Sequence, residues 1–231
     1  MPRCSIRSMA AHTSRVIAAL ALAVATLVLG PINGSAQDAP ARPLPDSLID
    51  QRAPDTFLVE FQTTAGRFLV RAHREWSPHG VDRLYHLVRL RYFDGVVIYR
   101  VVPDRFAQFG LTDDAEVNRA WREHPIPDEP VVASNTKGRI HFARGGPNTR
   151  SNQLSIMRGD NAYLDDIDAN GVVGFPPVAE VVEGIEVIDA LNEEHGNEPL
   201  SHYDSIAAKG REYLDRVFPG LDVIRTARLV E

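Results

Sequence analysis

Cysteine is nearly absent from this sequence, with one residue, Cys4, among 231. A single cysteine cannot form an intramolecular disulfide, and it cannot supply the thiolates of a cysteine-based zinc site. Cys4 also precedes the long apolar run of the N-terminal region, where it is not placed for lipid attachment. The fold must therefore depend on an apolar core, for which 44% hydrophobic and 24% charged residues are ordinary values.

Positive charge is also in deficit, because 25 lysines and arginines face 31 aspartates and glutamates, a formal net charge of −6. Binding of nucleic acid through its phosphates needs a basic face, so nucleic acid is not an expected partner. The sequence has no internal repeat, no metal-ligand spacing among its histidines and no G-x-S-x-G nucleophile elbow. A hydrolase therefore lacks support, and we expect neither a metal nor a cofactor.

The first 36 residues have the pattern of a secretory signal peptide. Three arginines without an acidic residue precede an apolar run over 16–29, and small residues follow at 34–36. The run of 14 residues is short for a membrane span, and an uncleaved anchor is the alternative. We expect a signal peptide over 1–36, a flexible linker over 37–54, and a periplasmic or secreted protein without stable membrane insertion after cleavage.

From residue 55 the sequence predicts many short strands and few helices. Residues 56–63 alternate between apolar and polar side chains, as a half-buried strand does, and 67–72 return after a turn as a hairpin. Ser77 and Pro78 precede apolar residues at helical spacing, which predicts a helix to about residue 91, and a second long helix is expected over 206–218. Shorter elements are predicted as strands at 96–102, 106–110, 138–144, 153–157, 178–182 and 222–230, and as a helix at 185–191. This pattern favours a mainly β fold, a closed or nearly closed antiparallel barrel with helices covering its ends.

Arg100 is unusual because it lies within the apolar strand predicted over 96–102. Strict alternation places three apolar residues on its face: Val96, Ile98 and Val102. A guanidinium in a dry core is costly unless it is paired, so this face must open to a cleft or Arg100 must meet a carboxylate. The alternative is a structural arginine that reaches solvent from a strand edge. Gln108 follows eight residues later, with Phe106 on the same side of the next strand.

A second unusual segment covers residues 143–153, where Gly-Gly-Pro-Asn signals a turn among many amide and hydroxyl side chains. Together with other segments in the same order, it resembles the cyclophilins, which are peptidyl-prolyl cis/trans isomerases. The other matching segments are 99–103, 108–110, 128–130, 138–140, 163–165 and 181–189. The resemblance runs from about residue 56 to 191, and the tail over 211–222 is similar to the ending of some bacterial members. Each motif alone is weak, but their common order is specific.

The resemblance implies an eight-stranded antiparallel barrel capped by two helices, with a surface groove that takes an X-Pro dipeptide. Arg100 matches the catalytic arginine of the family, and Gln108 matches the glutamine that orients it. Substrate-binding positions are expected at Phe106, Ala143, Arg144, Gln153, Tyr163, Leu164 and Phe175. The partners implied are proline-containing polypeptides, and a monomer that needs no cofactor is expected. We divide the chain into a cyclophilin-like domain over 55–195 and a C-terminal helix and strand extension over 196–231 that packs on the barrel.

Several positions depart from the family pattern. Arg105 stands where an aromatic residue is expected, and we expect it to repel the nearby Arg100. Ser155 stands where the pocket floor has phenylalanine, and the loss of that ring removes apolar contact with the substrate, in part replaced by Phe175 in the place of a histidine. Tyr163 stands where tryptophan is usual. These departures predict weakened activity or altered substrate preference.

The sequence therefore supports two functions. The first is an exported prolyl isomerase that assists the folding of secreted proteins, because X-Pro isomerisation is slow enough to limit folding. The second is a catalytically weak module that binds proline-containing peptides as a chaperone or scaffold.

A smaller motif at Asp166, Asp168 and Asn170 copies the start of a calcium loop, but Pro177 stands where the closing glutamate belongs. An acidic turn exposed to solvent is the simpler explanation.

Overall fold

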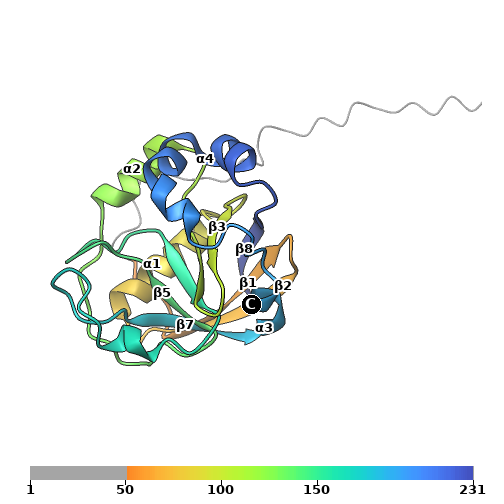
Figure 1. The fold of residues 1–231 in the computed structure, drawn as a ribbon. Coiled ribbons are helices and arrows are strands. Elements are labelled where there is room, and N and C mark those ends of the chain that lie inside the picture. The colour runs from red at the N-terminus through yellow and green to blue at the C-terminus, as the bar shows by residue number, and fades with distance from the viewer. Residues whose placement is uncertain (1–50, 231) are drawn as a thin grey trace, which may run out of the picture. The chain divides into compact units, whose positions relative to one another are not determined.

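The computed structural model describes residues 51–230, so the predicted signal peptide and all but the last four residues of the predicted linker lie outside the described residues. Its frame is an eight-stranded antiparallel sheet that curls around an apolar interior (Figure 1). The spatial order of the strands is β3-β4-β6-β5-β7-β2-β1-β8. The strands are β1 Thr56–Thr63, β2 Arg67–His73, β3 Ile98–Val102, β4 Phe106–Phe109, β5 Arg139–Phe142, β6 Leu154–Met157, β7 Pro177–Glu183 and β8 Ile224–Val230. The expected eight-stranded antiparallel fold is confirmed.

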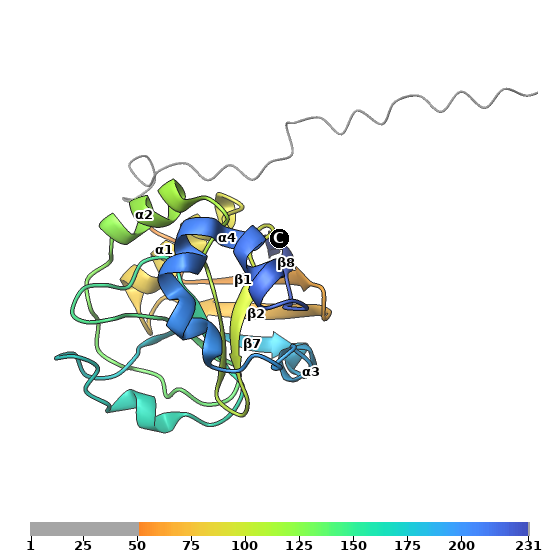
Figure 2. The ribbon, with the colours of Figure 1, turned by 45° about the horizontal axis from the view of Figure 1, so that its top comes forward.

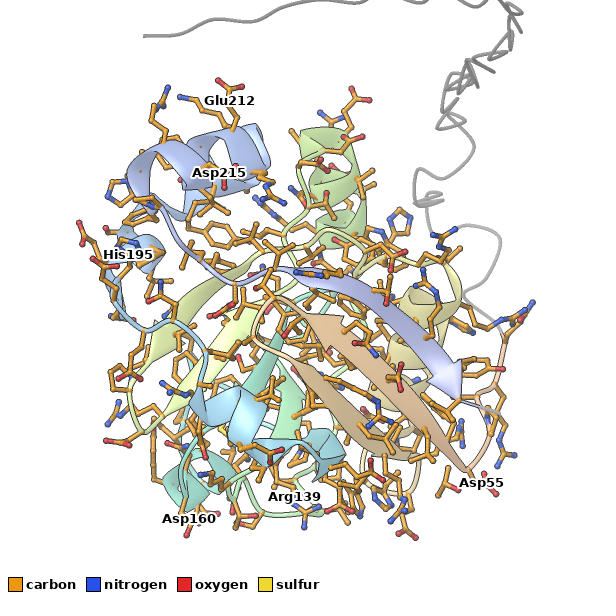
Figure 3. The ribbon with its side chains drawn as sticks, turned by 90° about the vertical axis from the view of Figure 1, so that its right-hand side faces the viewer. Asp55, Arg139, Asp160, His195, Glu212 and Asp215 are labelled. Carbon is orange, nitrogen blue, oxygen red and sulfur yellow. The ribbon has the colours of Figure 1, made fainter. Side chains whose placement is uncertain are left out.

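The two edge strands of this sheet approach each other and close it. An isolated antiparallel bridge joins Val97, just before β3, to Val223, just before β8. The amide of Ile98 donates to the carbonyl of Asp222 at 2.8 Å. The β8 strand pairs with β1 along its length, and Figure 3 shows β2, β1 and β8 side by side. The segment 196–231, expected to pack on the barrel, therefore supplies one of the strands of the sheet itself.

The first helix, α1 Pro78–Arg89, covers one opening of the curled sheet. Its buried face carries Val81, Leu84, Leu87 and Val88, the apolar residues whose spacing predicts it. Ser77 occupies the N-cap position, but its side chain does not cap the helix. Glu129 takes this role from a distant loop, because its carboxylate accepts the amides of His79 at 2.8 Å and Gly80 at 3.2 Å.

The C-terminal helix α4, Tyr203–Val217, covers the outer face of β3 and lies against α2, Ala115–Glu123, in both Figure 1 and Figure 2. A second apolar cluster forms there, in which Ile206 and Leu214 pack with Tyr99. The helix kinks at Gly210, which has φ +55°, and a Cβ at this position would lie 2.3 Å from the Cα of Asp113. Glycine is therefore required by both the backbone conformation and the close approach.

The remaining helical pieces are short. They are α3 Ile185–Asp189, η2 Ala162–Asp165 and η3 Glu198–His202. The sequence indicated α3 but not α2, η2 or η3. Within residues 51–230, no helix combines the length and the apolar character that crossing a membrane requires.

Candidate active site

A pocket of about 560 Å³ opens beside β4, β5 and β6. Its walls come from segments far apart in the sequence, including the turn that follows β5, the residues around η2 and the start of α4. Eight of the nine site residues expected from the sequence line it: Arg100, Phe106, Gln108, Ala143, Arg144, Gln153, Leu164 and Phe175. Four of the segments that carry the family resemblance, 99–103, 108–110, 143–153 and 163–165, therefore meet at this pocket.

Arg100 reaches this pocket because the alternation of β3 is interrupted. The register between β3 and β4 shifts between Ile98 and Arg100, which marks a bulge or irregularity at this point. Ile98 and Val101 both belong to the main core, whereas Arg100 lines the pocket. The expectation that Arg100 shares a face with Val96 and Ile98 is therefore wrong, because the irregularity changes the side-chain parity. The expected cleft is present.

The Arg100 guanidinium is held by amide oxygens. Its Nη1 donates to Gln108 Oε1 at 2.8 Å, and its Nε donates to Asn197 Oδ1 at 2.8 Å. The guanidinium carbon lies 4.7 Å from the centroid of the Phe106 ring. Burial lowers the pKa of Arg100 from its usual value. Within the described part of the chain no carboxylate forms an ion pair with Arg100, so its charge is not neutralised by a direct partner.

Gln153 connects the polar groups behind the pocket. Its Oε1 accepts from the Tyr99 hydroxyl at 2.7 Å and from Gln108 Nε2 at 3.2 Å. Its Nε2 donates to the Tyr203 hydroxyl at 2.8 Å. Burial raises the pKa of Tyr99, which keeps this hydroxyl protonated and able to donate. Gln108 and Gln153 therefore have fixed orientations.

The buried side chain of Arg144 forms its contacts with other residues of the protein. It pairs with Asp128 at 3.1 Å, donates to the carbonyls of Val172 and Gly174, and lies 4.9 Å from the centroid of the Phe175 ring. Burial lowers the pKa of Arg144, and Asp128 opposes this effect. These contacts hold the loop that carries Phe175 against the strand end at Ala143.

His141 is a pocket residue that the sequence analysis missed. It lies directly opposite Ser155 in the β5–β6 pair, and its ring stacks on Phe175 with centroids 5.0 Å apart. The imidazole therefore supplies aromatic surface beside the small Ser155, where the resemblance implied a phenylalanine. The sequence alone carried no signal for this role, because it depends on the pairing of His141 with Ser155 across two strands.

The protonation state of His141 is set by its neighbours. Asn135 uses its amide hydrogens on Asp165 at 2.7 Å and on the carbonyl of Phe175 at 2.8 Å, so its oxygen accepts from His141 Nδ1 at 2.7 Å. Burial, reinforced by the charges of Arg144 and Arg150, lowers the pKa of His141 to about 3. The ring is therefore neutral at physiological pH, with its proton on Nδ1.

Tyr163 and Arg105 lie apart from the pocket. Tyr163 does not line the pocket and is 46% exposed, and the guanidinium of Arg105 lies 5.5 Å from its ring centroid. The Arg105 guanidinium therefore contacts the ring of Tyr163.

The acidic motif near η2 forms a turn. The carboxylate of Asp168 accepts the amide of Gly171 at 2.6 Å, and Asp168 bridges to Val173. Among the residues with described positions, no three histidine, cysteine or carboxylate groups gather as a metal site would require.

Comparison with known proteins identifies a family for most of this chain. Residues 58–209 match the family described as cyclophilin type peptidyl-prolyl cis-trans isomerase/CLD. Peptidyl-prolyl cis-trans isomerase ppi1 of Schizosaccharomyces pombe is 31% identical over 110 residues, which cover 46% of this chain and 71% of that protein. The peptidyl-prolyl cis-trans isomerase of Acinetobacter baylyi is 25% identical over 158 residues, 68% of this chain and 80% of its own.

The fold has counterparts among solved structures. A cyclophilin type peptidyl-prolyl cis-trans isomerase of Cryptosporidium parvum, crystallised in the presence of the dipeptide Ala-Pro, superposes with a TM-score of 0.54 at 13% identity. The superposition covers 75% of this chain and 99% of that chain, and it shows the likeness of the fold. Because the family match spans more than half of the sequence, the chain belongs to the cyclophilin-type peptidyl-prolyl cis-trans isomerase family.

Proposed function

We propose that this protein catalyses cis-trans isomerisation of X-Pro peptide bonds through Arg100. Rotation about an amide is opposed by resonance, with a barrier of about 18–20 kcal/mol. A donor that localises the lone pair of the proline nitrogen stabilises the twisted state more than either planar state, and so accelerates rotation. The observation that carries the proposal is that the Arg100 guanidinium lies in the pocket, fixed by Gln108 and without a carboxylate partner in residues 51–230.

The rest of the pocket provides an apolar binding surface for the prolyl ring. Phe106, Leu164 and Phe175 supply apolar surface, and the neutral imidazole of His141 adds to it. Burial of the ring there contributes favourable free energy of about 25 cal/mol per Å². No bond is broken in the reaction, so the residues present need to orient the substrate and donate hydrogen bonds, and they need not supply a nucleophile.

The test is a protease-coupled isomerisation assay on X-Pro peptides with wild type and Arg100→Ala. We expect the variant to lose activity by about 10²-fold, the effect typical of removing one transition-state donor. Arg105→Ala is the matched control, because its guanidinium lies against Tyr163 outside the pocket. Equal rates for wild type and Arg100→Ala, both at the uncatalysed level, would instead support a binding module that holds proline-containing peptides as a chaperone or scaffold.

We further propose that the protein is exported and acts on polypeptides folding in the periplasm or outside the cell. The basic start, apolar run and small residues of 1–36 support this location. N-terminal sequencing of the protein from fractionated cells tests it. We expect a chain that begins near residue 37 outside the cytoplasm, and an unprocessed cytoplasmic chain would contradict the proposal.

A further inference from the structure

We infer that the segment 197–203 is part of the active site and positions its polar side chains, with Asn197 holding Arg100 and Tyr203 holding Gln153. This inference rests on the proposed function, because it assigns roles in the same reaction. The segment comprises Asn197, the short helix η3 Glu198–His202 and the first residue of α4. It belongs to the C-terminal region that the sequence indicated only as an extension.

Asn197 restricts rotation of the Arg100 guanidinium plane, which the contact with Gln108 alone does not prevent. The Gln108 contact holds Nη1, and the Asn197 contact holds Nε, so two separate nitrogens fix the rotation of the guanidinium plane. Within residues 51–230, Nη2 makes no hydrogen bond and is the nitrogen left for a substrate. With one anchor removed, the plane can rotate and Nη2 loses its fixed direction. Misplacement of a catalytic group by small distances is expensive in rate.

Tyr203 acts in the same way on the second polar group. Its hydroxyl accepts the Nε2 hydrogen of Gln153, whose Oε1 accepts from Gln108. A continuous chain of side chains therefore links Asn197 to Arg100, Gln108, Gln153 and Tyr203, and it begins and ends on the segment 197–203. Both ends of the chain are supplied by backbone that is close in sequence, so displacement of this segment would disturb both.

The fold holds the segment firmly enough for this role. On the N-terminal side, His195 Nε2 contacts the carbonyl of Pro219 at 2.9 Å and its ring packs on Phe218. Figure 3 labels His195 where the chain leads towards α4. On the C-terminal side, Tyr203 packs with the second apolar cluster under α4. The helix therefore anchors the residues that hold the site.

The test compares Asn197→Leu, which keeps the size of the side chain but removes the acceptor, with Asn197→Asp, which restores an acceptor for Nε. Tyr203→Phe removes only the hydroxyl. We expect Asn197→Leu and Tyr203→Phe each to lower kcat by about fivefold to tenfold with KM nearly unchanged, and Asn197→Asp to recover part of the loss. The control is Glu194→Gln, an exposed residue that lies just before the segment and outside it.

A second readout follows the contact itself. The ¹⁵N resonance of the Arg100 Nε–H group, identified by its absence in Arg100→Lys, is expected to be sharp and slow to exchange in wild type and to broaden in Asn197→Leu. A structural effect without positioning would leave this resonance unchanged. If wild type is active while the variants match the control in kcat and in the Nε–H signal, the positioning role is overturned and the proposed function stands. If wild type itself has no activity, the proposed function and this inference fail together.

Discussion

At the scale of single residues, the chemistry depends on where charges and protons are kept. Arg100 has no carboxylate partner within residues 51–230, whereas His141, which also lines the pocket, carries no charge because it is buried and lies near Arg144 and Arg150. The sequence identified Arg100, since an arginine in an apolar strand demands an explanation. It did not identify His141, because the role of that residue depends on Ser155 lying opposite it in a neighbouring strand.

His141 gives the folded protein a definite response to acid. Its pKa falls from 6.5 to about 3 on folding, so below pH 6.5 the unfolded chain binds a proton that the folded chain does not. The free energy of unfolding should therefore fall as pH drops from 6.5 towards 3, by up to about 1.4 kcal/mol per pH unit from this group. Denaturant titrations of wild type and His141→Phe at pH 7.5 and pH 5 measure it.

The His141→Phe variant lacks the titrating imidazole and serves as the comparison in these denaturant titrations. Between these two pH values we expect His141→Phe to lose about 2 kcal/mol less stability than wild type. Identical losses would mean that His141 is not buried in its neutral form. Because the ring stays neutral from pH 8 to pH 5, protonation of His141 should not change catalysis in that range.

At the scale of secondary structure elements, local patterns predicted the strands well, and the contacts between distant segments could not be predicted. The helix α1 begins at Pro78 as the sequence indicates, yet its N-terminal amides are capped by Glu129, about fifty residues away. Strand β3 was predicted, but the shift in its register was not, because it is defined only by the pairing with β4. The hydrophobic periodicity of the sequence describes one strand at a time. The face on which a side chain lies depends also on the neighbouring strand, and helix capping can depend on a distant loop.

The pairing of the large His141 with the small Ser155 across β5 and β6 can be tested by exchanging the sizes of the two side chains. Ser155→Phe alone should overpack the pocket floor against His141 and cost about 1–3 kcal/mol of stability. His141→Ser alone should leave a cavity and lower the free energy of unfolding by a comparable amount. The double variant restores one large and one small side chain, so its loss should be smaller than the sum of the single losses. Denaturant unfolding of all four proteins gives the coupling free energy.

If the stability losses of Ser155→Phe and His141→Ser add up in the double variant, the two side chains do not fill the same space. The single variant Ser155→Phe also reports on the pocket, because narrowing the floor should raise KM for X-Pro peptides before it changes kcat.

At the scale of the whole molecule, the order of the motifs along the chain was enough to predict the curled antiparallel sheet and most of the pocket. The motifs recognised in the sequence run only to about residue 191, although the family match extends to residue 209, and they did not predict which side chains of the C-terminal region reach the site. In the structure that region supplies β8, which completes the sheet, and α4, which covers β3. It also supplies Asn197 and Tyr203 to the polar network, so the active site includes residues from the C-terminal region.

Above all, we propose that the Arg100 charge accelerates rotation of an X-Pro bond held in this pocket. Exchange NMR on an excess of an X-Pro peptide tests it most directly, because it observes cis and trans forms at equilibrium without a coupled enzyme. With substoichiometric wild type, we expect cis-trans exchange peaks on the time scale of seconds or faster, and with Arg100→Leu we expect peptide chemical-shift changes from binding but no exchange peaks. Equal exchange with both proteins would contradict the account.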